Sequence, residues 1–463
     1  MKKKIICLAT ALSLVAGSVA GVGQSTPVKA AGVEITEENF GTDSFVLDTV
    51  RMMDENKDNI LSDEEAAKVK ALSFLDDTED ISPIIKYFPN LVDVQINLEK
   101  TTSLTINHSS VKKLEVNSQN VVELKGTNGI TEVICRLNGV KGKVDFSKVK
   151  GYEKITRFSV SGAGITDVVA PNQSKLTYLS ITGTSMGTVD TAKYKKVNTL
   201  NLSNNKLKSV NVKKNSTLVS LACYDNKLTS LNISSNKKLK DIGVGGNKLK
   251  KLDTSKNSKL NRVVAYNNNI KSYNSASNKK LKQIYMSSNK LTKLDLSKNK
   301  ELASLYLESN KLTKLDVSKN KKLESLDVSN NKIKTLTFSK NNKKLNYINV
   351  KETKLKKLSL PSNVKLSYVY VGKKYKLLKN VKLKSSGHMS IQMNLPANKV
   401  YQLTKMIPAL KGFKFETTSI DKLTVNEKTG KFKMPKLEKN LMASIHATKG
   451  KASVYVDLYP MTK

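Results

Sequence analysis

Apolar and polar positions along the middle of this chain follow one fixed frame, Leu-x-x-Leu-x-Leu-x-x-Asn. One instance consists of Leu302, Leu305, Leu307 and Asn310. The asparagine recurs after ten and eleven residues in turn, so one full period is 21 residues. Its positions are Asn205, Asn215, Asn226, Asn236, Asn247, Asn257, Asn268, Asn278, Asn289, Asn299, Asn310, Asn320, Asn331 and Asn341. A fixed period of this kind predicts a solenoid of stacked coils.

The frame predicts a mainly β solenoid with parallel strands on both faces, spanning residues 91–383. In Leu-x-Leu the side chains alternate across a short strand, so the leucines point inward and the residue between them points outward. The asparagine at the following turn bonds backbone groups inside the coil and tolerates left-handed geometry. Neither half of the period has the ten or more residues of helical periodicity that a helix needs. Because both faces would have the same strand spacing, we expect a nearly straight stack.

The run LTKLDLSKNKELASLYLESNKLTKLDVSKN, which starts at Leu291, resembles the 21-residue bacterial class of leucine-rich repeats. Such repeats occur in secreted and surface proteins and are distantly similar to internalins. The resemblance covers the predicted solenoid. It implies the fold and a cell-surface binding role, and it names no particular partner.

Residues 1–31 have the layout of a secretory signal peptide. A charged start, MKKK, precedes an apolar segment, and small residues surround a predicted cleavage site after Ala30 or Ala31, with Ala20 as the alternative. No later stretch reaches the roughly twenty apolar residues of a membrane span. The C-terminus carries no sorting motif followed by an apolar tail. We therefore expect a secreted protein without a transmembrane segment. Non-covalent association of the secreted protein with the cell wall is an additional option.

Cys135 and Cys223, the two cysteines that follow the predicted signal peptide, occupy inward strand positions in the repeat. Four coils separate them, which is roughly 19 Å at the usual strand spacing. This exceeds the reach of a disulfide. We expect both to be buried core thiols.

Residues 32–90 are acidic where the rest of the chain is basic, and they predict a small helical cap with a calcium loop. Residues 54–65 match an EF-hand loop in ligand type and spacing. Asn59 stands where glycine is expected, and asparagine is the best other residue for the left-handed conformation required there. The expected calcium ligands are Asp54, Asn56, Asp58, Ile60, Ser62 and Glu65.

An acidic helix cap is the alternative for this segment, because Ser62 and Glu65 also fit a capping box. The segment resembles the EF-hand cap that precedes such repeats in Gram-positive secreted proteins. That resemblance implies a rigid, calcium-held cap on the first coil.

Residues 384–463 change character, since short runs of alternating apolar and polar residues are separated by turn residues. The pattern predicts a small β-sandwich and weakly resembles bacterial immunoglobulin-like domains. The alternative is a β-cap on the solenoid. His446 in this region has no partner that the sequence reveals.

The chain is strongly basic, with 80 Lys and Arg against 39 Asp and Glu and a net charge of +41. Lysines follow the ladder asparagine in successive coils, among them Lys290, Lys311 and Lys332. Neighbours in such a ridge stand about 5 Å apart, inside a Debye length of about 8 Å. The ridge therefore attracts polyanions such as phosphate-bearing wall polymers or glycosaminoglycans. The alternative is compositional bias; no nucleic-acid motif points to a specific nucleic-acid partner.

Several outward strand positions are tyrosines. Tyr285 and Tyr306 lie between the paired apolar residues of successive coils, and Tyr224 and Tyr266 lie just after them. Tyr347, Tyr368 and Tyr370 extend the set. Tyrosines on a rigid face suit recognition of sugars or protein, although tyrosine also simply favours strands.

These patterns predict a secreted, non-catalytic binding or adhesion protein that uses the solenoid surface, with calcium in the N-terminal cap. The expected partner is a protein or glycan at the cell surface, with help from the lysine ridge on anionic polymers. One alternative is a structural protein held electrostatically on wall polymers. Another is an enzyme with its activity in the C-terminal region, although the sequence shows no catalytic constellation there.

Overall fold

The computed structural model describes residues 32–75, 77–127, 129–361, 364, 366–373, 387–418, 423–437 and 441–460. The predicted signal peptide, the predicted end of the solenoid, residues 374–383, and the first three residues of the predicted β-sandwich, 384–386, lie outside them.

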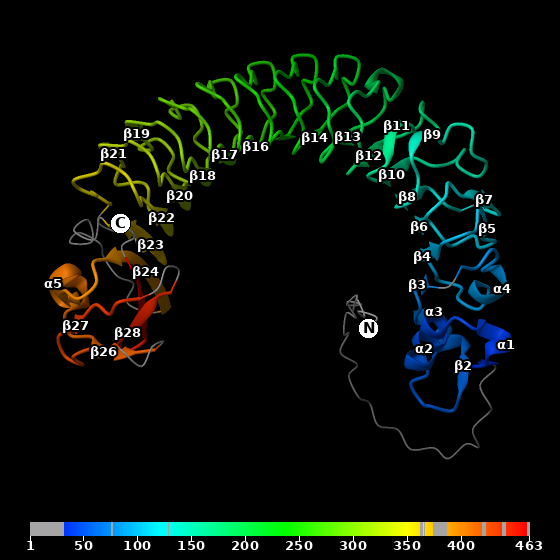
Figure 1. Cartoon of the computed structure of the whole chain (residues 1–463), viewed down its shortest axis with the longest axis horizontal. Coiled ribbons are helices and arrows are strands. Elements are labelled where there is room, and N and C mark those ends of the chain that lie inside the picture. Colours follow the sequence, from blue (N-terminus) through cyan, green and yellow to red (C-terminus); the bar gives the residue numbers. More distant parts are fainter. Residues whose placement is uncertain are drawn as a thin grey trace.

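One long sheet lines the inner side of an arc (Figure 1). Along the arc its parallel strands are β3 (Ala71–Phe74), β4 (Asp93–Leu98), β6 (Lys113–Ser118), β8 (Glu132–Leu137), β10 (Arg157–Ser161), β12 (Tyr178–Thr182), β13 (Thr199–Asn201), β14 (Ser220–Ala222), β15 (Asp241–Gly243), β16 (Arg262–Val264), β17 (Gln283–Tyr285), β18 (Ser304–Tyr306), β20 (Ser325–Asp327), β22 (Tyr347–Asn349), β23 (Tyr368–Gly372) and β24 (Gly387–Leu395). Equivalent residues of successive coils face each other, as Ile284 faces Leu305. The predicted mainly β, leucine-rich solenoid is confirmed.

The outer side carries paired strands only at intervals. The pairs are β5 (Ser103–Thr105) with β7 (Glu123–Lys125), β9 (Gly142–Asp145) with β11 (Ile165–Val169), and β19 (Lys314–Asp316) with β21 (Thr335–Thr337). A single bridge joins Asn211 to Asn232. Strands on both faces are thus present, but only the inner sheet is continuous.

The expectation of a straight stack is wrong, because the coils follow a curved path (Figure 1). A continuous hydrogen-bond ladder holds the inner strands at about 4.8 Å. On the outer side the strand ladder is interrupted, so continuous strand pairing does not impose that spacing there. The coils splay outward and the inner sheet becomes concave.

Two ladders of buried asparagines join the coils, as the sequence predicts. In the first, Asn226 Nδ2 donates to the Leu202 carbonyl at 2.8 Å, and its Oδ1 accepts from the Leu207 N–H at 3.0 Å. In the second, Asn236 Nδ2 donates to the carbonyls of Val212 and Asn215 at 2.9 and 2.8 Å. Each amide therefore ties its coil to the one before.

The predicted last member of the second ladder, Asn341, is wrong by one residue. Asn342 is the buried one, and its Nδ2 donates to the carbonyls of Val317 and Asn320. This coil has an extra residue, because Ser325 pairs with Tyr347 instead of the residue before it. A one-residue insertion in an exposed turn leaves the inward pattern intact.

The core is a continuous column of aliphatic side chains inside the coils. Cys135 and Cys223 are free and buried within it, as expected. Burial raises the pKa of both thiols to about 12. Neither thiol is ionised at neutral pH, which fits a packing role.

The N-terminal cap is a small helical unit on the first coil. Its elements are β1 (Gly32–Glu34), α1 (Glu37–Phe40), α2 (Ser44–Met53), β2 (Ile60–Ser62), α3 (Asp63–Lys68) and α4 (Ser82–Ile85). Asp43 caps α2 by accepting from the Phe45 N–H, and its other oxygen accepts from the Leu75 N–H at 2.6 Å. This carboxylate joins the cap to the solenoid. The inner sheet already begins at β3, before the predicted start at residue 91.

The C-terminal region continues the solenoid sheet instead of forming a separate sandwich. The elements of this region are β25 (Val400–Gln402), α5 (Leu403–Met406), η3 (Pro408–Leu410), β26 (Lys414–Thr417), β27 (Lys431–Lys433), β28 (Ala443–Lys449) and β29 (Ala452–Pro460). A further element, the short helix η1 (Thr191–Lys193), lies between β12 and β13 in the solenoid. β29 pairs in parallel with β24, β28 pairs antiparallel with β29, and β26 with β28. β25 and β27 form a pair of their own. The sheet is open, with β3 and β26 at its two ends.

Candidate binding surface

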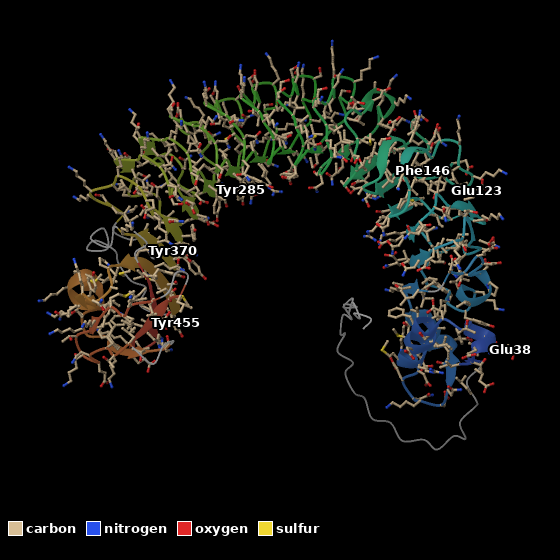
Figure 2. The ribbon with its side chains drawn as sticks, in the orientation of Figure 1. Glu38, Glu123, Phe146, Tyr285, Tyr370 and Tyr455 are labelled. Atoms are coloured by element: carbon tan, nitrogen blue, oxygen red, sulfur yellow. The ribbon has the colours of Figure 1, made fainter. Side chains whose placement is uncertain are left out.

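Tyrosine side chains form a column on the inner sheet. Tyr285 and Tyr306 are register neighbours in β17 and β18. Their half-exposed rings stack with centroids 5.1 Å apart and 13° between the planes. Figure 2 shows Tyr285, Tyr370 and Tyr455 along the inner side of the arc. Stacked in this way, the two rings cover each other's faces, so their edges and hydroxyl groups are what a ligand would meet.

The column continues through the next strands. The Tyr306 ring lies 6.2 Å from that of Tyr347, which contacts Tyr368 at 6.3 Å and Tyr370 edge-on at 5.4 Å. The Tyr347 hydroxyl lies 3.3 Å from a carboxylate oxygen of the buried Asp327. Burial, followed by the Asp327 charge, raises the pKa of Tyr347, so this hydroxyl keeps its proton.

A cation stands at each end of the column. The Arg262 guanidinium lies 5.8 Å from the Tyr285 ring centroid. At the other end the Lys351 ammonium lies 5.2 Å from the centroid of Tyr370 and 5.6 Å from that of Tyr459. Lys351 also donates to Gln392 Oε1 at 3.2 Å, and burial lowers its pKa. Tyr459 and Gln392 belong to β29 and β24, so the column reaches the C-terminal region.

A second aromatic pair precedes the column. Tyr224 and Tyr266 are two coils apart, yet their rings stack at 6.1 Å with 20° between the planes. Gly243 and Gly245 in the intervening coil make room for them. A Cβ atom at Gly243 would meet the Tyr224 ring at 2.3 Å, and one at Gly245 would meet the Tyr266 ring at 2.6 Å. The repeat pattern reveals both tyrosines but not the two glycines that make room for their rings.

The N-terminal half of the inner sheet carries ion pairs instead of stacked tyrosines. Lys113 pairs with Asp93 at 2.5 Å, Arg136 with Glu115, and Arg157 with Glu132 at 2.8 Å. The Arg157 guanidinium also lies 4.4 Å from the Tyr178 ring centroid. This half offers a polar, internally neutralised surface.

The predicted lysine ridge does not share the tyrosine surface. Lys290, Lys311 and Lys332 are exposed and follow the buried ladder asparagines at the turn that leaves the inner sheet. The backbone N–H groups of Lys290 and Lys311 donate to carbonyls of the previous coil at 2.9 Å, which holds their spacing. Among the described inner-sheet strands from β8 to β24 no residue is a lysine, whereas the outer strands β9 and β19 contain Lys143 and Lys314. The seven predicted ligand-face residues therefore fall on two surfaces.

Loop 54–65 joins α2 to α3 in the helix–loop–helix order of the expected calcium loop. Asn59 has a φ of 62°, the left-handed conformation predicted for it. Asp54 accepts from the Asn59 N–H at 2.9 Å and Asp58 from the Ile60 N–H at 2.9 Å. The backbone fits an EF-hand loop.

The loop side chains fit calcium less well than the backbone does. Glu65 accepts from the Ser62 N–H and hydroxyl at 2.9 and 2.6 Å and from the Glu55 N–H at 2.8 Å. With Ser62 it forms a capping box, the predicted alternative. The Ser62 hydrogen bonds lower the pKa of Glu65. In the described part of the chain, no three His, Cys, Asp or Glu side chains gather closely enough to hold a metal ion.

His446 has two partners that the sequence did not reveal. Its Nδ1 lies 2.7 Å from Glu416 Oε1, its Nε2 lies 2.7 Å from Ser453 Oγ, and its ring stacks on Tyr455 at 4.4 Å. The order Ser–His–Glu is that of an acyl-transfer triad. However, β29, which carries Ser453, is paired on both edges, so its backbone N–H groups are used in the sheet and offer no oxyanion hole. The His446 ring, held between Glu416 and Ser453, stacks on the Tyr455 ring.

A hollow of about 660 Å³ lies on the outer side, around β19 and β21. Leu294 and Leu315 contribute its apolar surface, and Asp295 and Asp316 stand at its rim. Both carboxylates accept backbone N–H groups two residues on, from Ser297 and Ser318 at 2.8 Å. The carboxylates of Asp295 and Asp316 thus stabilise the turns of the solenoid through these hydrogen bonds.

Comparison with known proteins agrees with the fold. A family model described as "Leucine Rich repeat" matches residues 224–245 and 319–335. No curated protein matches the chain. No helix in the described residues has the length and apolar character to cross a membrane.

Several solved structures resemble the chain at low identity. The functional domain of InlJ from Listeria monocytogenes is 18% identical, with 93% of this chain and 99% of that one covered and a TM-score of 0.47. An internalin, InlF, from Listeria monocytogenes is 19% identical, with coverages of 70% and 98% and a TM-score of 0.48. A leucine-rich repeat protein from Leptospira interrogans is 20% identical, with coverages of 72% and 91% and a TM-score of 0.47.

Proposed function

We propose that this chain is a non-catalytic binding protein whose inner tyrosine column, Tyr285, Tyr306, Tyr347, Tyr368 and Tyr370, is the main contact surface for a protein ligand. The stacked column itself carries the proposal. Five rings lie within 6.3 Å of a neighbour on a rigid sheet, so little side-chain freedom is lost on binding. Tyrosine is also among the residues that dominate protein interfaces.

A protein ligand is favoured over a glycan by the orientation of the rings. Sugar rings pack on exposed aromatic faces, whereas Tyr285 and Tyr306 cover each other's faces. Their edges and hydroxyl groups suit the mixed apolar and polar surface of a protein. A glycan is the second candidate, through the more exposed Tyr368, which is 46% exposed.

The test compares wild-type chain with the double variant Tyr285→Ala/Tyr306→Ala on an array of purified extracellular proteins and glycans. We expect wild-type binding to a protein and at least a tenfold loss in the variant. Tyr178→Ala is the matched control, because Tyr178 lies on the same sheet outside the column. Equal binding by wild type and double variant would disprove the role of the column.

A second proposed activity is retention on an anionic polymer. It is supported by the exposed lysines on the turns and the outer side of the solenoid, which together are called the flanks. Counterion release makes such binding fall log-linearly with salt. The triple variant Lys290→Gln/Lys311→Gln/Lys332→Gln should flatten this dependence, and the matching Lys→Arg triple should preserve it. An unchanged slope in the Gln variant would favour compositional bias.

We further propose that loop 54–65 binds calcium and that the bound ion supplies positive charge to the carboxylates of the loop. Asp54, Asn56, Asp58, Ile60, Ser62 and Glu65 would hold it. The proposal rests on the loop backbone and the left-handed Asn59. Extracellular EF-hand modules bind at roughly 10⁻⁴–10⁻³ M. Calorimetric titration of the full chain should show such binding, and Glu65→Gln should abolish it; no heat of binding in wild type would leave only the capping box.

Secretion follows from the signal-like N-terminus and is proposed together with non-covalent retention on the cell wall through the lysines. Cell fractionation tests both. We expect the protein in the medium and on the wall, and release of the wall fraction by salt. Retention in the cytoplasm would contradict the proposal.

A further inference from the structure

Charge is divided unevenly between the surfaces of the solenoid. Residues 199–349, from β13 to β22, contain 31 lysines and one arginine against nine aspartate and glutamate residues. On the inner strands of this stretch the charged residues are only Asp241, Arg262 and Asp327. The segment as a whole thus has a large positive charge, whereas its inner strands have almost no net charge.

The division is kept strand after strand. The outward residues of the inner strands are small, polar or aromatic, as in Ser-Leu-Tyr of β18 and Ser-Leu-Asp of β20. Lysines begin at the rim, where Lys240 and Lys282 directly precede β15 and β17 and are exposed. Beyond the rim they occupy the turns and the outer side.

This division separates two kinds of ligand. A polyanion gains affinity by direct contact between its charged groups and several cations. The flanks supply such cations in every coil. The inner strands carry one cation, Arg262, and two anions, Asp241 and Asp327. A protein ligand seated on the tyrosines needs neither the lysines nor their release of counterions.

We infer that the inner tyrosine surface and the lysine-bearing flanks are two separate binding surfaces that are filled at the same time. The chain would then link an anionic polymer on its flanks to a protein partner in its arc. This inference rests on the two proposed activities and adds that they do not compete.

Footprinting on the full chain tests the separation without knowledge of the protein partner. Heparin and inorganic polyphosphate serve as two polyanion probes, one sulfated and one phosphate-based. Lysine acetylation and tyrosine nitration are each quantified by mass spectrometry with and without saturating probe. We expect acetylation of Lys290, Lys311 and Lys332 to fall at least threefold, and nitration of Tyr368 and Tyr455 to stay within 20%.

Other outcomes overturn the inference in distinguishable ways. Equal protection of lysines and tyrosines would mean that the polyanion enters the arc, so the surfaces are one. No protection of any lysine would mean that the flanks bind no polyanion, which removes the polymer arm but leaves the proposed protein binding standing.

Variants give an independent measurement of the same separation. The Lys290→Gln/Lys311→Gln/Lys332→Gln triple should weaken heparin binding at least threefold, and the Lys→Arg triple should not. Tyr285→Ala/Tyr306→Ala should leave heparin affinity unchanged within twofold. A loss of heparin affinity in the tyrosine variant that matches the lysine variant would overturn the inference.

Discussion

The rings of Tyr224 and Tyr266 stack with their centroids 6.1 Å apart, although a whole coil lies between the two coils that carry these residues. The intervening coil places Gly243 and Gly245 beneath them, and a Cβ at either glycine would penetrate a ring. Two small residues therefore bring together two large ones that the repeat by itself would keep apart.

Gly243→Ala should disturb this pair. The new methyl group meets the Tyr224 ring at 2.3 Å, so the ring must move away. We expect a stability loss of about 1–3 kcal/mol, the usual cost of overpacking, and faster nitration of Tyr224. The backbone itself accepts alanine, because the register neighbour of Gly243 in β14 is Ala222. Gly243→Ala combined with Tyr224→Ala should recover most of the loss; full additivity of the two changes would show that the contact is unimportant.

Thr254→Val should destabilise the second asparagine ladder, to which Asn236 and Asn278 belong. The Thr254 hydroxyl contacts Asn278 Oδ1 at 2.7 Å and the Tyr273 hydroxyl at 3.0 Å, all buried. Valine leaves both partners without that bond, at a cost of about 1–3 kcal/mol. Chemical denaturation measures the change, and a loss below about 0.5 kcal/mol would contradict it.

Val212→Thr should have the opposite sign. Val212 precedes Asn236 by the same 24 residues that separate Thr254 from Asn278, and Asn236 Oδ1 is buried without a hydrogen-bond partner. A hydroxyl at residue 212 would donate to it, so we expect unchanged or higher stability. Asn257 and Asn320 show the same unpaired oxygen, with Ile233 and Leu296 at the equivalent place. Clear destabilisation by Val212→Thr would disprove this explanation.

The pH dependence of the cap should show the contribution of Glu65. Its Ser62 hydrogen bonds lower its pKa below the ordinary 4.5, so the folded state holds this carboxylate in its ionised form. The resulting stability is fully present above about pH 4.5 and is lost as the pH falls through the lower folded pKa. Melting of the wild-type cap between pH 3 and pH 6, followed by hydrogen exchange of α2 and α3, should reveal this loss. Glu65→Gln should be less stable at pH 6 and should lack this component of the pH dependence.

Tyr285→Ala/Tyr306→Ala should leave thermal stability nearly unchanged, in contrast to Leu305→Ala. The tyrosines are half-exposed, whereas Leu305 is fully buried, and its truncation should cost roughly 2–5 kcal/mol. Differential scanning calorimetry of the two variants provides the comparison. A loss in the tyrosine variant as large as that of Leu305→Ala would show that the column is structural.

The sequence by itself determined the local design of this protein. The 21-residue period, the inward leucines and the two asparagine ladders follow from residue types at fixed spacing, because each coil repeats the same short-range bonds. The left-handed Asn59, the capping box of Ser62 and Glu65, and the buried state of Cys135 and Cys223 could be predicted in the same way.

Tertiary structure alone decided how these local units add up. The arc depends on whether the outer strands pair continuously, which is a property of neighbouring coils and not of one repeat. The Tyr224–Tyr266 stack depends on glycines in another coil, and the partners of His446 come from strands 30 residues before and seven residues after it. The separation of lysines from tyrosines likewise appears only when successive coils are stacked, since in sequence the two residue types are interspersed along the same repeats.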